Sequence, residues 1–180
     1  KRPDCYYPFY ALAGVGVAFK LILALAIKNG LKTTDVFNQY VDIATLGTIA
    51  DVVPLLGENR VIVDKGLKIL HNPKRIGIRA VMEVAGVLDK PLSASTIAFS
   101  IAPRLNAAGR LGSAATAVEL LLTNDESRAR ELALLLDTEN KERQQTERQI
   151  FDEALELIAK DPNFEKKKVN VLSQENWHNV

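Results

Sequence analysis

The sequence predicts a mainly α-helical chain with a long connector helix and one strand of a second domain. Apolar residues recur at helical spacing along most of its length. One stretch, residues 137–149, has no aliphatic or aromatic side chain, although the segments on both sides carry apolar stripes. A strand-like apolar run at 169–172 follows near the end. The composition, 47% hydrophobic and 25% charged over 180 residues, is that of an ordinary globular protein.

The first half of the chain is expected to form helices separated by turn signals. Asn29-Gly30 ends the first of them. The second is short, because the apolar run after it leads into a turn of small residues, and the chain must leave the helix before Pro54. The expected helices cover residues 13–28, 34–40, 58–70 and 77–85.

In the second half, Ser93 offers a capping side chain for a short helix. Pro103 is expected to change the direction of the chain, because proline cannot donate the helical hydrogen bond. Residues 104–110 are therefore predicted as a loop, with Gly109 and Gly112 framing a turn. The expected helices of this half cover residues 97–101, 114–122 and 125–161.

The last of these helices is polar on all sides in its middle. A helix of this kind usually bridges solvent between two packed bodies. The alternative is a solvated helix in a bundle or coiled coil, but no heptad pattern continues through the polar centre. We therefore interpret residues 125–161 as a connector between domains.

Charge, cysteine content and hydropathy exclude several classes of protein. The net charge is +1, so any contact with nucleic acid must be local. Cys5 is the only cysteine, which excludes an internal disulfide and favours a reducing compartment, by default the cytoplasm. The longest apolar stretch, residues 11–27, is interrupted by Lys20 and predicts a buried helix with no membrane partner. Because the chain starts without Met and stops after a strand-like run, we expect a fragment of a longer protein.

Asp51 is the first candidate for chemistry. It follows a small-residue turn in apolar surroundings. Burying an unpaired carboxylate is costly, so such a residue binds a cation, caps a helix or pairs with a base. Spacing alone favours helix capping, because one carboxylate does not make a metal site even for hard cations such as Mg²⁺ and Mn²⁺.

A second candidate group consists of Arg104, Asn106 and Arg110 in a segment rich in glycine and alanine. Small residues let a ligand approach the backbone, and guanidinium groups bind phosphate through two hydrogen bonds, so the group suits a phosphate contact. The alternative is a pair of arginines that bind carbonyl groups at a helix end. His178, next to Trp177, is a further candidate, with an ordinary packing Trp beside an exposed His as its alternative.

Several motifs, taken in order, closely resemble the RecJ family of single-stranded-DNA exonucleases within the DHH phosphoesterases. They are Leu-Ala-Gly-Val-Gly-Val-Ala-Phe-Lys-Leu at 12–21, Leu-Gly-Thr-Ile-Ala-Asp-Val-Val-Pro-Leu at 46–55, Gly-Glu-Asn-Arg at 57–60, and Pro-Arg-Leu-Asn-Ala-Ala-Gly-Arg-Leu-Gly at 103–112. The resemblance covers nearly the whole chain.

The resemblance implies a division of the chain and an activity. Residues 1–124 would form the helical, C-terminal part of an α/β DHH catalytic domain, 125–161 the connector, and 162–180 the start of a DHHA1 domain. The intact protein would degrade single-stranded DNA from 5′ to 3′ in recombination and repair, with two Mn²⁺ or Mg²⁺ ions. Asp51 would be a metal ligand; the remaining ligands would precede the chain, so the fragment alone would be inactive.

The resemblance also assigns substrate contacts and partners. Arg104, Asn106 and Arg110 fall where members of the family approach the DNA strand and its terminal phosphate. His178 falls in a Gly-Trp-His motif from which this chain departs at Asn176 and Val180. Single-strand-binding proteins and helicases are expected partners. The alternatives are a DHH phosphodiesterase for short oligonucleotides or cyclic dinucleotides, and a non-catalytic binding protein with the same fold.

Overall fold

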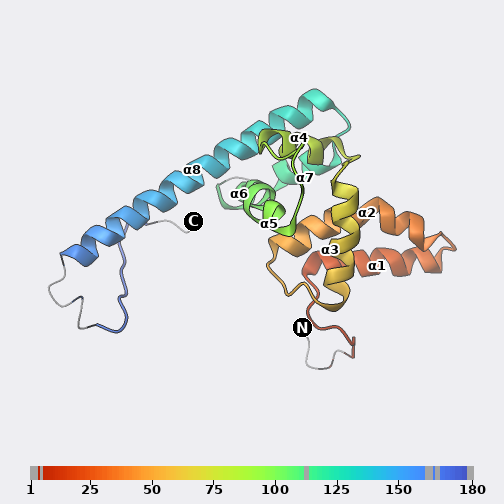
Figure 1. Ribbon diagram of the computed structural model, residues 1–180, viewed down its shortest axis with the longest axis horizontal. Helices are drawn as coiled ribbons and strands as arrows, with labels where there is room; N and C mark the ends of the chain where they lie inside the picture. The colour runs from red at the N-terminus through yellow and green to blue at the C-terminus, as the bar shows by residue number, and fades with distance from the viewer. Residues whose placement is uncertain (1–3, 5, 112–113, 161–163, 165–166, 178–180) are drawn as a thin grey trace.

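The computed structural model describes residues 4, 6–111, 114–160, 164 and 167–177, with the backbone alone at Ala108, Arg110 and Leu111 (Figure 1). Every regular element in this described part is helical, which confirms the predicted mainly α fold. Among the same residues, none of the helices combines the length and the hydropathy needed to span a lipid bilayer.

The first three helices pack together, with α1 (Gly14–Lys28) and α2 (Thr33–Ala50) side by side and α3 (Gly57–Leu70) crossing them (Figure 1). α3 packs against α2. The predicted short helix at 34–40 is wrong, because α2 continues to Ala50. Its later apolar residues recur at helical spacing and are buried, and Gly47 leaves room for Val15 of α1, whose Cγ1 would lie 2.8 Å from a Cβ at this position. Gly47 therefore acts as a packing contact inside a helix and not as a turn.

The remaining helices pack around a larger core. They are α4 (Ile76–Val84), α5 (Ala94–Thr96), the π-helical turn η1 (Ile97–Ile101), α6 (Ala102–Leu111), α7 (Ala115–Leu122) and α8 (Glu126–Ala159). The largest fully buried apolar side chains of this core come from α3, α4, η1, α7 and α8: Leu70, Ile78, Met82, Ile97, Ile101, Leu120 and Leu136.

The predicted change of direction at Pro103 is wrong. α5, η1 and α6 follow one another without a break from Ala94 to Leu111. A proline in a helix lacks its N–H and crowds the carbonyl group four residues earlier. The π turn lies directly before Pro103, and its wider hydrogen-bond spacing accommodates this mismatch. Residues 104–110 are therefore helix and not loop, and Gly109 lies inside α6; Gly112 lies outside the described residues.

The connector helix is only partly solvated. α8 has 34 residues, and its polar stretch begins with Asp137 and Asn140, which are both buried. Beyond them α8 extends away from the body (Figure 1). The chain then returns, and Trp177 Nε1 donates a hydrogen bond to Glu153 Oε2 at 2.7 Å. The strand predicted at 169–172 is wrong, since these residues have no regular structure. A β-strand needs a second strand to accept and donate its backbone hydrogen bonds, and the described residues include no second strand.

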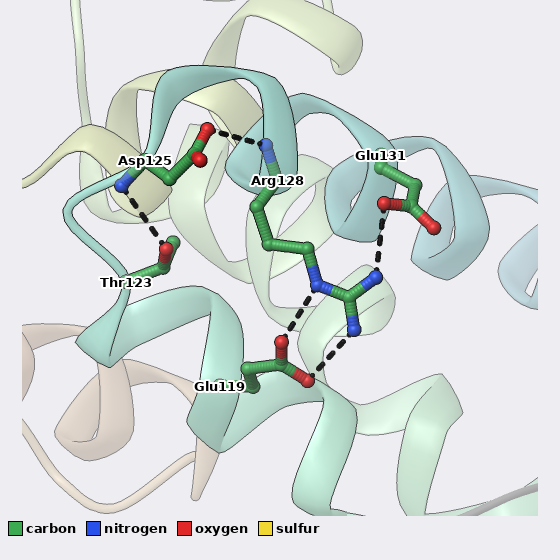
Figure 2. Close-up of polar contacts among 5 residues, drawn as sticks. All are labelled: Glu119, Thr123, Asp125, Arg128 and Glu131. Atoms are coloured by element: carbon green, nitrogen blue, oxygen red, sulfur yellow. Dashed lines mark hydrogen bonds and ion pairs between the residues drawn. The ribbon is translucent and has the colours of Figure 1, made fainter.

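The corner between α7 and α8 confirms that the long helix predicted from residue 125 begins there (Figure 2). Asp125 caps α8 by accepting a hydrogen bond from the backbone N–H of Arg128, and its own N–H donates to Thr123 Oγ1. The Arg128 guanidinium donates two hydrogen bonds to Glu119 and pairs with Glu131 at 2.9 Å. The hydrogen bonds from Arg128 hold the pKa of Glu119 below its ordinary value. This network ties α7 to the first turn of α8.

Candidate metal and phosphate site

A hollow of about 380 Å³ lies where the start of α1, the end of α2 and the middle of α6 meet. Segments that are far apart in the sequence come together here, and most of them contribute small side chains. The lining residues are Ala13, Gly14, Val15, Gly47, Ala50, Asp51 and Asn106. The hollow thus unites Asp51 with Asn106, two of the residues singled out in the sequence.

Asp51 supplies the only carboxylate that the described part of the chain brings to this lining. It occupies the C-cap position of α2 and is exposed, so the apolar surroundings predicted for it are wrong. In the described part of the chain its carboxylate has no hydrogen-bond or ion-pair partner. A carboxylate cannot donate to the free carbonyl groups of a helix end, and the negative pole of the helix repels it. Helix capping therefore does not explain Asp51.

Val52, the next residue, is held in the left-handed region with φ 54°, the only positive φ found at a described residue other than glycine. Glycine normally takes this position after a helix, because a Cβ is strained there and a β-branched side chain more so. Val52 is also 85% exposed, so burial does not compensate the strain. Two locally unfavourable features therefore lie next to each other at the hollow: a carboxylate with no partner in the described part of the chain, and a strained backbone. Such features are common at functional sites.

Replacing Val52 with glycine is expected to raise the free energy of unfolding by about 1 kcal/mol, because the left-handed conformation costs a residue with a Cβ roughly 1–2 kcal/mol and glycine much less. Urea unfolding of the two proteins measures the difference. Val53→Gly, at a position whose φ is not positive, serves as the matched control and should be destabilising. A Val52→Gly protein no more stable than the parent would show that the backbone is not strained.

The N-terminus of α1 opens on the same hollow. Ala13 is its N-cap residue and provides no side-chain hydrogen bond, and the first turn contains no acidic residue. The first N–H groups of a helix lack intrahelical partners and carry partial positive charge, which favours anions such as phosphate. The positive end of α1 therefore lies beside the negative end of α2, where Asp51 stands.

Asn59 holds the two walls of the hollow together, a role that the sequence analysis missed. Its side chain is fully buried on α3, and Nδ2 donates to the carbonyl oxygens of Ala11 at 2.6 Å and Pro54 at 3.0 Å. One acceptor precedes the start of α1 and the other follows Asp51. The sequence contained one sign of this role: Asn59 lies three and four residues before Ile62 and Val63, which places its amide on the apolar face of the predicted helix.

The three polar residues of α6 do not share one face. Residues two apart on a helix lie about 200° apart around its axis, so Asn106 faces the hollow while Arg104 faces α8. Arg104 donates to Asp137 Oδ1 from Nε at 2.8 Å and to the Ser100 carbonyl from Nη1. Position 110 follows Asn106 by about one turn of α6. His178 lies outside the described residues.

The hollow fits one part of a metal site. Carboxylate oxygen is a ligand that Mn²⁺ and Mg²⁺ prefer, and Asp51 presents it with no partner among the described side chains. Within the described ranges, however, no three His, Cys, Asp or Glu side chains gather in a way that could hold a metal ion. The described chain can therefore contribute one metal ligand but not a complete site.

A larger hollow, of about 580 Å³, lies between α2 and the α7–α8 corner. It includes none of the residues predicted to carry chemistry. Arg75 lines this hollow, but its guanidinium group is already engaged. It pairs with Asp42 at 2.9 Å and donates a hydrogen bond to the Gln39 carbonyl at 2.7 Å. We therefore place the candidate site at Asp51.

Comparison with known proteins gives a consistent result. No family model matches the chain. It is 43% identical over 158 residues to the single-stranded-DNA-specific exonuclease RecJ of Bacillus subtilis, across 88% of the chain and 19% of that protein. The chain spans between 19% and 32% of the length of the curated relatives that it matches.

Solved structures agree with the sequence comparison. A crystal structure of exonuclease RecJ bound to manganese superposes with a TM-score of 0.75 and 39% identity, over 86% of this chain and 38% of that one. A structure of RecJ from Thermus thermophilus in complex with Mg²⁺ superposes with a TM-score of 0.74 and 40% identity, over 89% of this chain and 24% of that one. Over the portion of those proteins that it matches, the chain belongs to the RecJ family.

Proposed function

We propose that the complete protein carrying this chain is a metal-dependent exonuclease that hydrolyses single-stranded DNA from 5′ to 3′, and that this chain forms one wall of its active site. The observation that supports the proposal most directly is the hollow, because it joins Asp51, Gly14 and Asn106 from three separate motifs of the sequence. The relatives named above are single-stranded-DNA-specific exonucleases, and their structures hold Mn²⁺ or Mg²⁺.

Different residues of the hollow would bind the metal ion and the DNA strand. Asp51 would hold a Mn²⁺ or Mg²⁺ ion, whose role when bound is to polarise the phosphodiester and activate water. The uncapped N–H groups at the start of α1 would bind a phosphate of the strand, and the small residues around them let that phosphate come close to the backbone. Asn106 would orient the strand by its amide, with Arg110 one turn further along α6 as a phosphate contact.

The experiment is a cleavage assay of the complete protein on a 5′-phosphorylated single strand, with Mn²⁺ and with EDTA. We expect mononucleotides from the 5′ end with Mn²⁺ only, and little release from the same strand in a blunt duplex. Absence of cleavage with Mn²⁺, or equal cleavage in EDTA, would contradict the proposal. Hydrolysis confined to dinucleotides or cyclic dinucleotides would assign the protein to the other DHH phosphodiesterases.

Three further proposals follow from the sequence pattern and the family likeness together. They are the division into a catalytic part at 1–124, a connector at 125–161 and the start of a second domain at 162–180; a cytoplasmic location; and an association with single-strand-binding proteins or helicases. The length of α8, Glu126–Ala159, supports the connector. Co-purification of the complete protein with a single-strand-binding protein, in the absence of DNA, would test the association.

A further inference from the structure

Arg104 and Asp137 form a partly buried ion pair between α6 and α8. The Arg104 side chain is 16% exposed and that of Asp137 is 8% exposed. Both Nε and Nη2 of Arg104 lie 2.8 Å from Asp137 Oδ1, and Nη1 donates to the Ser100 carbonyl on the preceding turn. All three guanidinium nitrogens are therefore engaged by the protein itself.

The surroundings of Asp137 keep its carboxylate ionised and therefore paired with Arg104. Its second oxygen, Oδ2, pairs with Lys141 at 2.7 Å. Burial would raise the pKa of the Asp137 carboxyl, but the hydrogen bond from Lys141 and the charge of Arg104 outweigh burial and hold that pKa below its ordinary value. The carboxylate thus stays ionised at neutral pH, and Arg104 keeps a fixed anion on α8.

The rotation of α6 about its own axis decides which of its residues face α8 and which face the hollow. Asn106 lies about 200° around the helix from Arg104, so the face that is bound to α8 and the face that lines the hollow are nearly opposite. A rotation of α6 that released Arg104 would move Asn106 relative to Asp51.

We propose that Arg104 is a positioning residue, whose ion pair with Asp137 holds α6 on α8 and thereby directs Asn106 toward Asp51. Arg104 then acts on the strand through Asn106 and not as a phosphate contact, which couples the connector helix to the site. The inference rests on the proposed function, since it assigns a role within that same site.

The first test is a double-mutant cycle in the complete protein, with Arg104→Ala, Asp137→Ala and both together. Misplacement of a binding group by about 1 Å costs up to about a hundredfold in rate, so each single variant is expected to lower kcat by about tenfold or more while KM for the strand changes little. The double variant should lower kcat no further than the worse single variant, because either change alone already breaks the ion pair that the two residues share. Unchanged kcat in Asp137→Ala would overturn the proposal.

The second test counts phosphate contacts. Each phosphate contact on a single strand contributes about 0.7 to the slope of log affinity against log salt concentration. Binding of a single strand in EDTA by Arg104→Ala should therefore show the slope of the unaltered protein. A slope smaller by about 0.7 would show that Arg104 contacts phosphate directly, against the proposal.

An alanine variant leaves a buried charge without its partner, which is destabilising and could prevent folding. Two milder variants test the proposal in that case. Arg104→Lys keeps the charge but loses the planar fork, and Asp137→Asn keeps the shape but loses the charge. Both are expected to lower kcat less than alanine does, with unchanged salt slopes. Arg79→Ala, which removes an exposed ion pair with Glu126 of α8, is the matched control and should leave kcat unchanged. If the unaltered protein does not cleave DNA, the proposed function is refuted. The salt dependence of strand binding still tests whether Arg104 contacts phosphate, because that measurement needs no cleavage.

Discussion

Replacing Asp51 with alanine in the complete protein is expected to reduce metal-dependent cleavage of single-stranded DNA by at least about a hundredfold. A metal ion that polarises a phosphodiester contributes several kcal/mol to the transition state, and each 1.4 kcal/mol corresponds to about tenfold in rate. Of the described residues, Asp51 supplies the only carboxylate that lines the hollow. Steady-state rates with saturating Mn²⁺ measure the effect.

The Asp51 carboxylate is also expected to lower the stability of the folded protein. Asp51 stands at the C-terminal end of α2 without a partner among the described residues, where the helix dipole disfavours an anion by about 0.3–1 kcal/mol. Asp51→Asn keeps the shape and removes the charge, so it should unfold at the same or slightly higher urea concentration while cleavage is lost. Retained cleavage in either variant would remove Asp51 from the metal site. Unfolding of both variants would make it a structural residue.

Replacing Gly77 with alanine is expected to destabilise the body of the molecule by about 3 kcal/mol, the upper part of the range measured for overpacked cores. A Cβ at Gly77 of α4 would lie 1.7 Å from the backbone oxygen of Leu120 in α7. Because this neighbour is backbone, the clash can be relieved only by separating the two helices. Urea unfolding, followed by the helical circular dichroism signal, measures the loss.

Gly109→Ala is the matched control for this prediction. Gly109 also lies within a helix, but a Cβ there would meet nothing within 4 Å. Since alanine favours a helix over glycine by about 1 kcal/mol, this variant should be as stable as the parent or slightly more so. Equal stability of the Gly77→Ala protein and the parent would show that α4 and α7 do not pack as closely as described.

Most helices were predictable from apolar residues that recur at helical spacing. Their burial was not, and the buried helix predicted at 11–27 is wrong in part, because Leu21, Leu25 and Ile27 of α1 are exposed. α1, α3, α4 and α7 begin and end within a few residues of the expected bounds. α2 was not predictable in full, since Gly47 and its small neighbours suggest a turn until Val15 of α1 is known to pack there. Pro103 misled for a similar reason: the π turn that accommodates it has no local signal in the sequence. At Gly47 the packing of another helix overrides a local preference, and at Pro103 the backbone geometry of the preceding turn does.

The candidate site was predictable in part. The motifs named Asp51 and Asn106, and the structure brings both to one hollow. Spacing also grouped Arg104 with them, because a loop would have allowed neighbouring side chains to point the same way. The helical backbone of α6 separates Arg104 from Asn106 instead. Asn59 was missed, since its role depends on two backbone carbonyls that the sequence does not place near it.

The central claim is that Asp51 is a metal ligand, and a Mn²⁺ titration followed by electron paramagnetic resonance tests it most directly. The signal of free Mn²⁺ reports how many ions the complete protein binds and how tightly. For Asp51→Ala we predict the loss of one bound ion, or an affinity at least about tenfold weaker, by analogy with the cost of losing groups that support a metal. Identical titrations for the two proteins would contradict the assignment of the hollow as a metal site.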